Sequence, residues 1–354
     1  MGGSGGAPRR IAVVLFNLGG PDRLSAVRPF LFNLFRDRAI LDLPAAARYP
    51  LAALIAALRT RTAKANYALM GGASPLIQET AAQAQALRTV LAERKIGEVQ
   101  VFTAMRYWRP DSEAAAAAVA AFRPDEVVLL PLYPQFSGTT TGSSLAAWRQ
   151  AYRGSGRVRA VCCYPEQPDF IAAHARRIGD AFEAGGRPPR LRLLFSAHGL
   201  PQKVIAAGDP YQAQVEATAV AVASRLGGDW DWQVCYQSRV GPLAWIGPST
   251  LEAIEAAGRE GLGVLISPIA FVSEHVETLV ELDHDYAAKA EAMGVRPYLR
   301  AAALGVRPEF IEALARLVLD RLETDGGGRS GSAYVCPQRS RGCPSQACKK
   351  GEAA

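Results

Sequence analysis

The segment LRLLFSAHGLP (191–201) has the same plan as IAVVLFNLGGP (11–21), which lies 180 residues earlier. Each is an apolar run that ends in a loop, and Gly19 aligns with Gly199. A short apolar run closed by Gly and Pro is typical of a buried strand in a parallel sheet. The pair indicates that the chain contains two copies of one unit that begins with a strand.

Three further pairs of segments occur in the same order in the two halves. They are VQVFTAMRYWRP (99–110) with WQVCYQSRVGP (232–242), VVLLPLYPQFS (127–137) with VLISPIAFVS (264–273), and QPDFIAAHARRIGDAFE (167–183) with RPEFIEALARLVLDRLE (307–323). Chance similarity of apolar strands is the alternative, but the aligned Arg106 and Arg239, and Ser137 and Ser273, count against it. Alternating strands and helices predict an α/β fold with a parallel sheet in each half.

Loop composition sets the expected domain organisation. Gly-Gly-Arg-Pro-Pro at 185–189 separates the halves, and a Gly- and Ser-rich linker follows Glu323. We expect a flexible tail at 1–8, a first domain at 9–186, a second domain at 187–325, and a Gly-rich linker with a Cys-rich tail at 326–354.

Composition describes a folded globular protein. Of 354 residues, 49% are hydrophobic and 21% are charged. The net charge of +7 suits acidic small molecules or an anionic membrane surface, whereas no basic run interleaved with aromatics points to nucleic acid. No secretory signal or apolar run of transmembrane length is present, so we expect a cytoplasmic protein. We expect Ala45–Leu58 to form an apolar helix that lies at the mouth of a pocket or on the inner face of a membrane. The alternative is an ordinary buried helix.

An acidic segment, SEHVETLVELDHD (273–285), follows the apolar run of the second half. Its carboxylates are Glu274, Glu277, Glu281 and Asp285. In an α-helix this spacing puts all four on one stripe, where like charges repel one another. A row of oxygen ligands for a divalent cation would explain such a stripe, and so would a proton relay. The alternative is a helix face exposed to solvent.

Polar residues also mark the other predicted strand ends. They are Asn17, Arg106, Tyr107 and Gln135–Thr141 in the first half, and His198, Gln237–Arg239 and Ser273–Glu277 in the second. Ligands of open α/β sheets bind at this edge, so two such edges facing each other predict a cleft. The imidazole of His198 can take a proton or bind a metal, although a structural histidine is the alternative. Gly19-Gly20-Pro21 is not G-x-G-x-x-G, which argues against a dinucleotide-dependent oxidoreductase.

Several long motifs resemble those of ferrochelatases, which insert ferrous iron into a porphyrin. The motifs are LFNLGGPD (15–22), YALMGGASPL (67–76), LYPQFSGTTTGSSL (132–145), LLFSAHGLPQKVIAAGDPY (193–211), QSRVGPLAWIGPST (237–250) and PIAFVSEHVETLVELD (268–283). The resemblance implies two Rossmann-like, chelatase-type domains with a porphyrin cleft between them. It implies insertion of Fe²⁺ into protoporphyrin IX with release of two protons, the last step of haem biosynthesis. A chelatase for coproporphyrin or another metal, and a non-catalytic porphyrin carrier, are the alternatives.

The resemblance also implies site residues. His198 would be the catalytic histidine, with Glu277 as its acidic partner across the cleft, and His275 would also be catalytic. His198, Glu277, Glu274 and Glu281 would handle the metal. The porphyrin would be held by Arg59, Tyr67, Ser74, Arg106 and Tyr107. In the family the acidic helix can contain a π-turn, so the α-helical stripe is approximate. Whether His198 acts as base or as metal ligand, which iron donor serves the enzyme, and whether it is a homodimer are left open.

Three cysteines close the chain: Cys336, Cys343 and Cys348. Thiols grouped among Pro and Gly in a reducing compartment indicate a metal site. The resemblance implies a [2Fe–2S] cluster, because some ferrochelatases carry one on a similar tail. Such a cluster uses four thiolates, and Gly138 stands where vertebrate-type members have the fourth. Cys162, Cys163 or Cys235 must then supply it, with one of the adjacent pair favoured; a basic tail with incidental thiols is the alternative.

Overall fold

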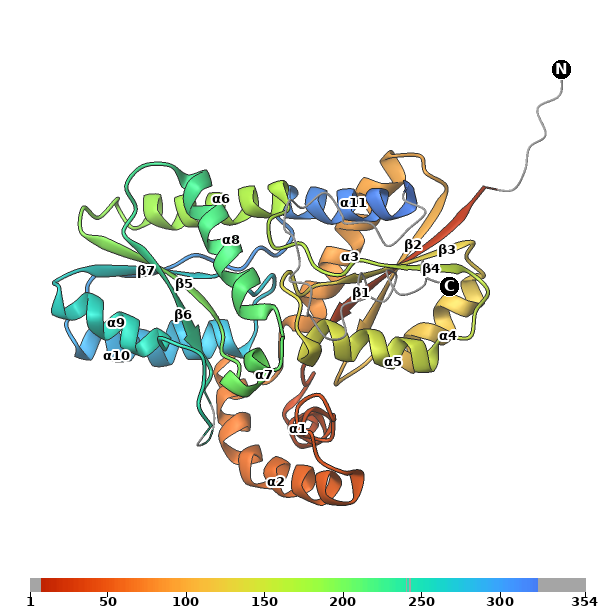
Figure 1. Ribbon diagram of the computed structural model, residues 1–354, viewed down its shortest axis with the longest axis horizontal. Coiled ribbons are helices and arrows are strands. Elements are labelled where there is room, and N and C mark those ends of the chain that lie inside the picture. The colour runs from red at the N-terminus through yellow and green to blue at the C-terminus, as the bar shows by residue number, and fades with distance from the viewer. Residues whose placement is uncertain (1–7, 240, 242, 324–354) are drawn as a thin grey trace.

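Two four-stranded parallel sheets form the interior of the molecule, shown in Figure 1. The structure is a computed structural model that describes residues 8–239, 241 and 243–323. The first sheet has the order β2-β1-β3-β4 and the second β6-β5-β7-β8. The strands are β1 (Arg10–Asn17), β2 (Glu98–Met105), β3 (Glu126–Pro131), β4 (Arg157–Ala160), β5 (Leu191–His198), β6 (Trp232–Gln237), β7 (Gly263–Pro268) and β8 (Tyr298–Arg300). The same order in both halves confirms the predicted fold class.

Equivalent strands also pair in equivalent register. Phe16 of β1 lies opposite Pro131 of β3, and Ser196 of β5 lies opposite Pro268 of β7. The prolines end both third strands earlier than the sequence predicted, since β3 was expected to reach residue 137 and β7 residue 273. Proline has no N–H to continue a ladder. The residues beyond each proline are therefore loop residues at the carboxyl edge of the sheet.

Helices cover both faces of each sheet. They are α1 (Val27–Phe35), α2 (Ala45–Leu69), α3 (Leu76–Glu93), α4 (Ser112–Phe122), α5 (Ser143–Ala151), α6 (Pro168–Ala184), α7 (Gln202–Ala206), α8 (Tyr211–Leu226), α9 (Thr250–Arg259), α10 (Ala287–Ala292) and α11 (Pro308–Glu323), with the 3₁₀ turn η1 (Leu24–Ala26). A π-helix follows the third strand of each half: η2 (Gly138–Gly142) after β3 and η3 (Glu277–Tyr286) after β7. The predicted repeat therefore extends to an unusual helix type at equivalent positions.

The last helix of each half crosses to the other half. Helix α6 follows the first sheet but packs on α8, β7 and β8 of the second, and α11 follows the second sheet but packs on α3 and β3 of the first (Figure 1). The two helices also pack on each other, with the rings of Phe170 and Phe310 6.4 Å apart. One apolar cluster consequently contains residues of both sheets, such as Val13 and Leu193. The boundary near residue 186 stays a proposal.

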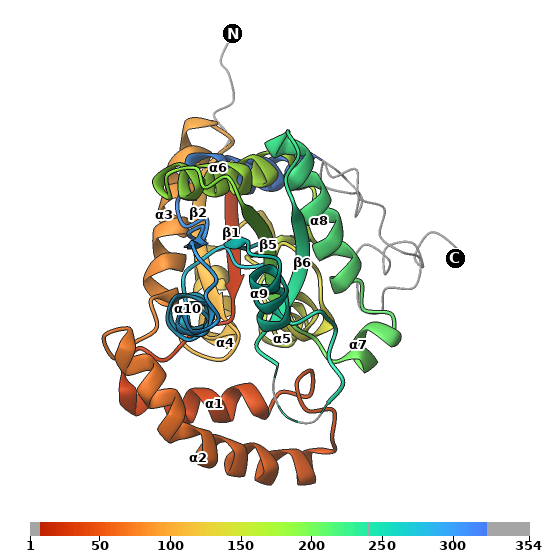
Figure 2. The same cartoon turned by 90° about the vertical axis from the view of Figure 1, so that its left-hand side faces the viewer.

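Helices α1 and α2 form a separate layer beyond the two sheets, as Figure 2 shows. They pack on each other, and Tyr67 of α2 is buried in the same apolar cluster as Tyr107. Helix α2 exposes large apolar side chains, with Leu54 55% and Leu58 73% exposed. In the described part of the chain, no helix combines the length and the apolar character that crossing a bilayer requires. We call α1 and α2 together the lip.

Candidate functional site

His198 is the last residue of β5, at the crevice between β5 and β7 where the strand order reverses. Its Nδ1 lies 2.6 Å from the carbonyl oxygen of Gly199. A carbonyl only accepts, so Nδ1 carries the proton in the neutral ring and the lone pair is on Nε2. The side chain is 37% exposed, which leaves Nε2 accessible for a proton or a metal ion.

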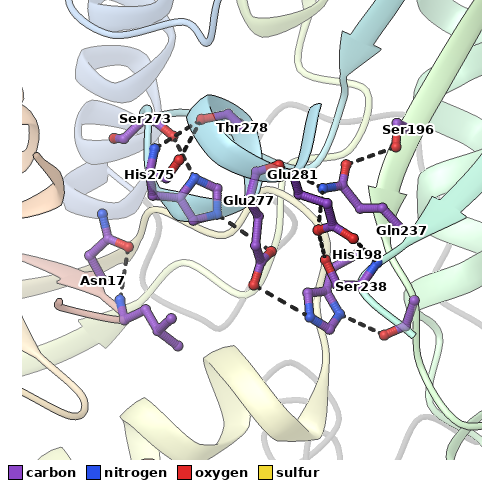
Figure 3. Close-up of polar contacts among 12 residues, drawn as sticks. Asn17, Ser196, His198, Gln237, Ser238, Ser273, His275, Glu277, Thr278 and Glu281 are labelled. Atoms are coloured by element: carbon purple, nitrogen blue, oxygen red, sulfur yellow. Dashed lines mark hydrogen bonds and ion pairs between the residues drawn. The ribbon is translucent and has the colours of Figure 1, made fainter. Parts of the chain in front are cut away.

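The carboxylate of Glu277 lies between two imidazole rings, as Figure 3 shows. Its Oε1 is 3.6 Å from Nε2 of His198, and its Oε2 is 3.5 Å from Nε2 of His275. Burial raises the pKa of Glu277, but the neighbouring imidazoles and a hydrogen bond from His275 have a larger, opposite effect. The net result is a pKa lowered to about 2. The carboxylate is therefore ionised at neutral pH and can stabilise a proton on either ring.

His275 is held from its other side. Its Nδ1 lies 3.2 Å from the carbonyl oxygen of Ser273, which again directs Nε2 toward Glu277. The backbone N–H of His275 donates to Oγ1 of Thr278 at 2.9 Å, and the ring of Phe271 lies 4.6 Å away. Backbone and ring contacts thus fix the orientation of the second imidazole. The result is a file of three titratable groups, His198, Glu277 and His275.

Gln237 fastens the start of η3 to the second sheet. This last residue of β6 pairs in register with His198. Its Nε2 donates to the carbonyl oxygen of Glu277 at 2.8 Å and to Glu281 at 3.0 Å, while its Oε1 accepts from Ser196. A buried amide satisfied on both ends is a rigid spacer. Gln237 therefore sets the separation between the imidazole of His198 and the π-helix.

The carboxylate of Glu281 is surrounded by hydrogen-bond donors from other residues of the chain. Its oxygens accept from Gln237 Nε2, from the backbone N–H and hydroxyl of Ser238, and from the hydroxyl of Tyr286 at 2.7 Å. These bonds use the acceptor sites of the carboxylate. In this arrangement Glu281 binds η3 to the end of β6.

The predicted single stripe of four carboxylates is wrong. The helix is a π-helix that begins only at Glu277, so Glu274 lies before it, outside any helix or strand. The carboxylate of Glu274 accepts from Arg300 at 2.9 Å and from the backbone N–H of Ala303 at 2.8 Å. Asp285 is 48% exposed beside His284. The acids differ in environment because π-helical hydrogen bonds span five residues and place side chains differently from an α-helix.

The predicted pair Arg106 and Tyr107 lies at the carboxyl end of the first sheet, where their backbone N–H groups donate to the carbonyl oxygens of Asn17 and Leu18. Both side chains contact Asp37, which no sequence motif had indicated. Asn17 itself donates to Thr80 at 2.9 Å. Its side-chain oxygen also accepts from the backbone N–H of Leu18, as Figure 3 shows. We call this edge of the first sheet, with Arg106 and Tyr107, the wall.

The other predicted porphyrin residues lie around the lip. Tyr67 is buried, and its pKa is raised by burial and by the negative charge of Glu277, which is nearby. Ser74 is buried against Gly20, where an added Cβ would lie 2.5 Å from it. Arg59 is exposed, with its guanidinium 5.7 Å from the ring centre of Phe35. The structure therefore brings Tyr67, but not Arg59, next to the file of titratable groups.

The cysteine prediction is only partly within the described chain, because Cys336, Cys343 and Cys348 lie outside it. Cys162 and Cys163 follow β4, with their sulfurs 3.6 Å apart and Cys163 half-buried. Cys235 is buried inside the second sheet, and burial raises the pKa of its thiol to about 12. Within residues 8–239, 241 and 243–323, no group of three or more His, Cys, Asp or Glu is arranged to hold a metal ion.

Comparisons with known proteins show the family of this chain. A family model described as Ferrochelatase matches residues 10–322. This chain belongs to the ferrochelatase family. It is 60% identical over 348 residues to the ferrochelatase of Caulobacter vibrioides, covering 98% of this chain and 99% of that one. It is 52% identical to the ferrochelatase of Hyphomonas neptunium, covering 97% and 96% of the two chains. As a ferrochelatase, it inserts ferrous iron into a porphyrin to form protohaem.

Solved structures support the fold of this ferrochelatase. SirB from Bacillus subtilis, solved with Fe³⁺, superposes with a TM-score of 0.54 at 12% identity, covering 89% of this chain and 96% of SirB. DR2241 from Deinococcus radiodurans, a multi-domain protein with structural similarity to chelatases, gives a TM-score of 0.51 at 14% identity, covering 90% and 55%. At these identities the similarity concerns the duplicated sheet architecture alone.

Sequence reasoning missed two residues of this ferrochelatase. Asp37 lies in an ordinary loop, and nothing in its neighbourhood distinguishes it from other surface acids. Gln237 was noted only as a polar residue at a strand end, although its position opposite His198 could have been found from the aligned strand ends. Both act through contacts between segments far apart in the chain.

Proposed function

We propose that this enzyme holds protoporphyrin IX between the carboxyl edges of its two sheets and removes the pyrrole protons through His198, Glu277 and His275. The observation that carries the proposal is the placement of the Glu277 carboxylate, 3.6 Å and 3.5 Å from the two imidazole Nε2 atoms. Metal insertion replaces two N–H protons of the macrocycle with Fe²⁺. A base that can pass protons onward is the chemistry that the reaction needs.

His198 is the proposed base. Its Nε2 lone pair accepts a pyrrole proton, and the resulting imidazolium keeps its Nδ1–H bond to Gly199 while facing Glu277. The second pyrrole proton follows the same route once His198 has passed the first to Glu277 and His275. A neighbouring carboxylate stabilises each charged imidazolium in a partly desolvated cleft. His275 then carries the proton away from the macrocycle.

Ferrous iron is a substrate here. Carboxylate oxygen and imidazole nitrogen both suit this ion, so Glu277 and His198 are the proposed contacts on its way to the ring. We also propose that Glu274 and Glu281 contact the metal ion. Metal binding there would compete with the hydrogen bonds that Glu274 accepts from Arg300 and that Glu281 accepts from Gln237.

The porphyrin would lie against Arg106 and Tyr107 on one side and against Tyr67 and Ser74 below the lip. Exposed Arg59 on α2 would meet a substrate carboxylate at the mouth. The lower-ranked candidate is coproporphyrin, which has four carboxylates instead of two. Turnover of the two free acids, measured side by side, would separate them.

The test uses purified enzyme with protoporphyrin and Fe²⁺ without oxygen, followed by porphyrin absorbance. His198→Ala should lower the rate by a factor of about 10²–10⁴, the usual share of a general base. His284→Ala is the matched control, because His284 is 62% exposed and pairs with Asp285. An unchanged rate in His198→Ala would overturn the proposed base.

We also propose a [2Fe–2S] cluster held by the three tail cysteines and one of Cys162 and Cys163. The adjacent thiols fit this role better than Cys235, since Cys163 is half-buried whereas Cys235 is fully buried in the sheet. Such a cluster supplies one-electron chemistry when bound. Cys162→Ser and Cys163→Ser, purified without oxygen, should differ in visible absorption and iron content. Equal, full iron content in both would contradict a ligand from this pair.

The lip is the proposed contact with the inner face of a membrane. Leu51, Leu54 and Leu58 are exposed along α2, whose charged residues are all basic. Apolar residues beside basic ones suit an interface of anionic lipids. Sedimentation with anionic vesicles should fall for Leu58→Glu, whereas Leu243→Glu, also at an exposed leucine, should not change it. The homodimer stays a prediction that sedimentation velocity would test.

A further inference from the structure

Asp37 joins the lip to the wall that carries Arg106. It lies in the connection between α1 and α2, and its side chain is only 9% exposed. Its Oδ2 accepts from Arg106 at 2.7 Å, from the hydroxyl of Tyr107 at 2.9 Å and from the hydroxyl of Ser143 at 2.6 Å. Its Oδ1 accepts from the backbone N–H of Ala39 at 3.0 Å. One carboxylate therefore holds three segments of the first half together.

The guanidinium of Arg106 is occupied by these contacts. Besides the ion pair with Asp37, its Nε donates to the hydroxyl of Ser143 at 2.6 Å, and its Cζ lies 5.1 Å from the ring centre of Tyr107. Its side chain is still 23% exposed. Burial raises the pKa of Asp37, yet the hydrogen bond from Ser143 and the charge of Arg106 hold it below its ordinary value. The pair is thus charged and mutually neutralised at neutral pH.

The neutralisation of Arg106 by Asp37 is important because the substrate itself carries carboxylates. A guanidinium without a partner binds a carboxylate through two parallel hydrogen bonds and is a strong trap for one. Protoporphyrin carries two carboxylates on one edge and is apolar elsewhere. An unpaired Arg106 on the wall would draw that acidic edge inward, whereas the exposed Arg59 draws it toward the mouth.

We infer that Asp37 is a positioning residue: by pairing with Arg106 it prevents capture of a porphyrin carboxylate at the wall, and so determines which edge of the macrocycle enters the cleft. The inference rests on the proposed binding of protoporphyrin between the two edges. It assigns Arg106 a contact with the flat ring and leaves the substrate's carboxylates to cations at the mouth. It also explains why a loop of the lip contributes an acid to a porphyrin-binding wall.

The test is Asp37→Asn, which keeps the size and removes the charge. A macrocycle held by Arg106 in the wrong orientation is a non-productive complex, so kcat and KM should fall by the same factor and kcat/KM should stay constant. The expected factor is about ten, as one new charge-assisted hydrogen bond would produce. With the dimethyl ester of the porphyrin, which has no carboxylate, neither constant should change. Fluorescence titration should show the same preference, with the affinity ratio of free acid to diester rising about tenfold.

Two comparisons separate positioning from mere support of the fold. In an Arg106→Leu background, Asp37→Asn should have no further effect, and Asp37→Glu should restore the wild-type ratio. Asp42→Asn is the control in the same loop, because Asp42 is 80% exposed and pairs only with Arg38 among the contacts described. Equal loss of kcat/KM on free acid and diester, or the same loss without Arg106, would overturn the inference. An unchanged rate in His198→Ala would overturn the proposed function, and the affinity ratio would still test Asp37.

Discussion

Replacement of Glu277 by glutamine tests the proton route most directly. The carboxylate lies 3.6 Å from Nε2 of His198. At an effective dielectric constant of about 20, a charge pair at that distance is worth about 5 kcal/mol. The Glu277 side chain is 23% exposed, so solvent screening reduces this to about 2–3 kcal/mol. Glu277→Gln should therefore lower kcat by about 30- to 160-fold.

The assay is single-turnover loss of porphyrin fluorescence after Fe²⁺ addition, with Glu255→Gln as the control at an exposed helical acid. The variant should also be less stable above pH 4.5, because the lowered pKa of Glu277 stabilises the fold there. That difference should shrink as the pH falls from 4.5 toward about 2. A kcat within roughly threefold of wild type, less than 1 kcal/mol, would refute the role of this charge.

Three further predictions concern residues that hold the site in place. Glu274→Gln should lower the free energy of unfolding by about 2 kcal/mol at pH 7, because it leaves Arg300 partly unpaired. Burial raises the pKa of Glu274, but the opposing effect of Arg300 is larger, so the net shift is downward. In urea denaturation, the difference in unfolding free energy between wild type and variant should therefore shrink as the pH falls below 4.5. A difference that stays constant with pH would contradict this. Gly20→Ala should cost about 1–3 kcal/mol, since the new Cβ would lie 2.5 Å from Ser74; calorimetry with an unchanged melting temperature would exclude the clash. Gln237→Leu should cost about 1–3 kcal/mol of stability by leaving acceptors of η3 unsatisfied, and should lower kcat as well. A lower melting temperature with full kcat would show that Gln237 does not position the site.

The order of the elements and the approximate place of the site could be read from the sequence. Apolar runs closed by Gly or Pro gave the strands, and their duplication gave two equal sheets, because burial of a parallel strand is recorded directly in its composition. Residues that follow such strands meet at one edge whatever the details of packing. His198 and Glu277 were therefore predicted to lie at one cleft, but the expectation that Glu277 faces His198 across it is wrong. Their Nε2–Oε1 distance of 3.6 Å puts both groups on the side formed by the second sheet, with no room for a macrocycle between them.

The helix type and the partner of each acid were decided only by the folded molecule. An α-helical stripe treats Glu274, Glu277 and Glu281 as equivalent, yet each meets a different partner in the structure. Those partners come from strands or loops far along the chain; Gln237, for instance, lies 44 residues before Glu281. The pairing of Asp37 with Arg106 and the exchange of α6 and α11 arise in the same way. Periodicity records which face of a segment is buried, but a hydrogen bond or ion pair between distant segments depends on where the whole fold brings them, and no local pattern carries that information.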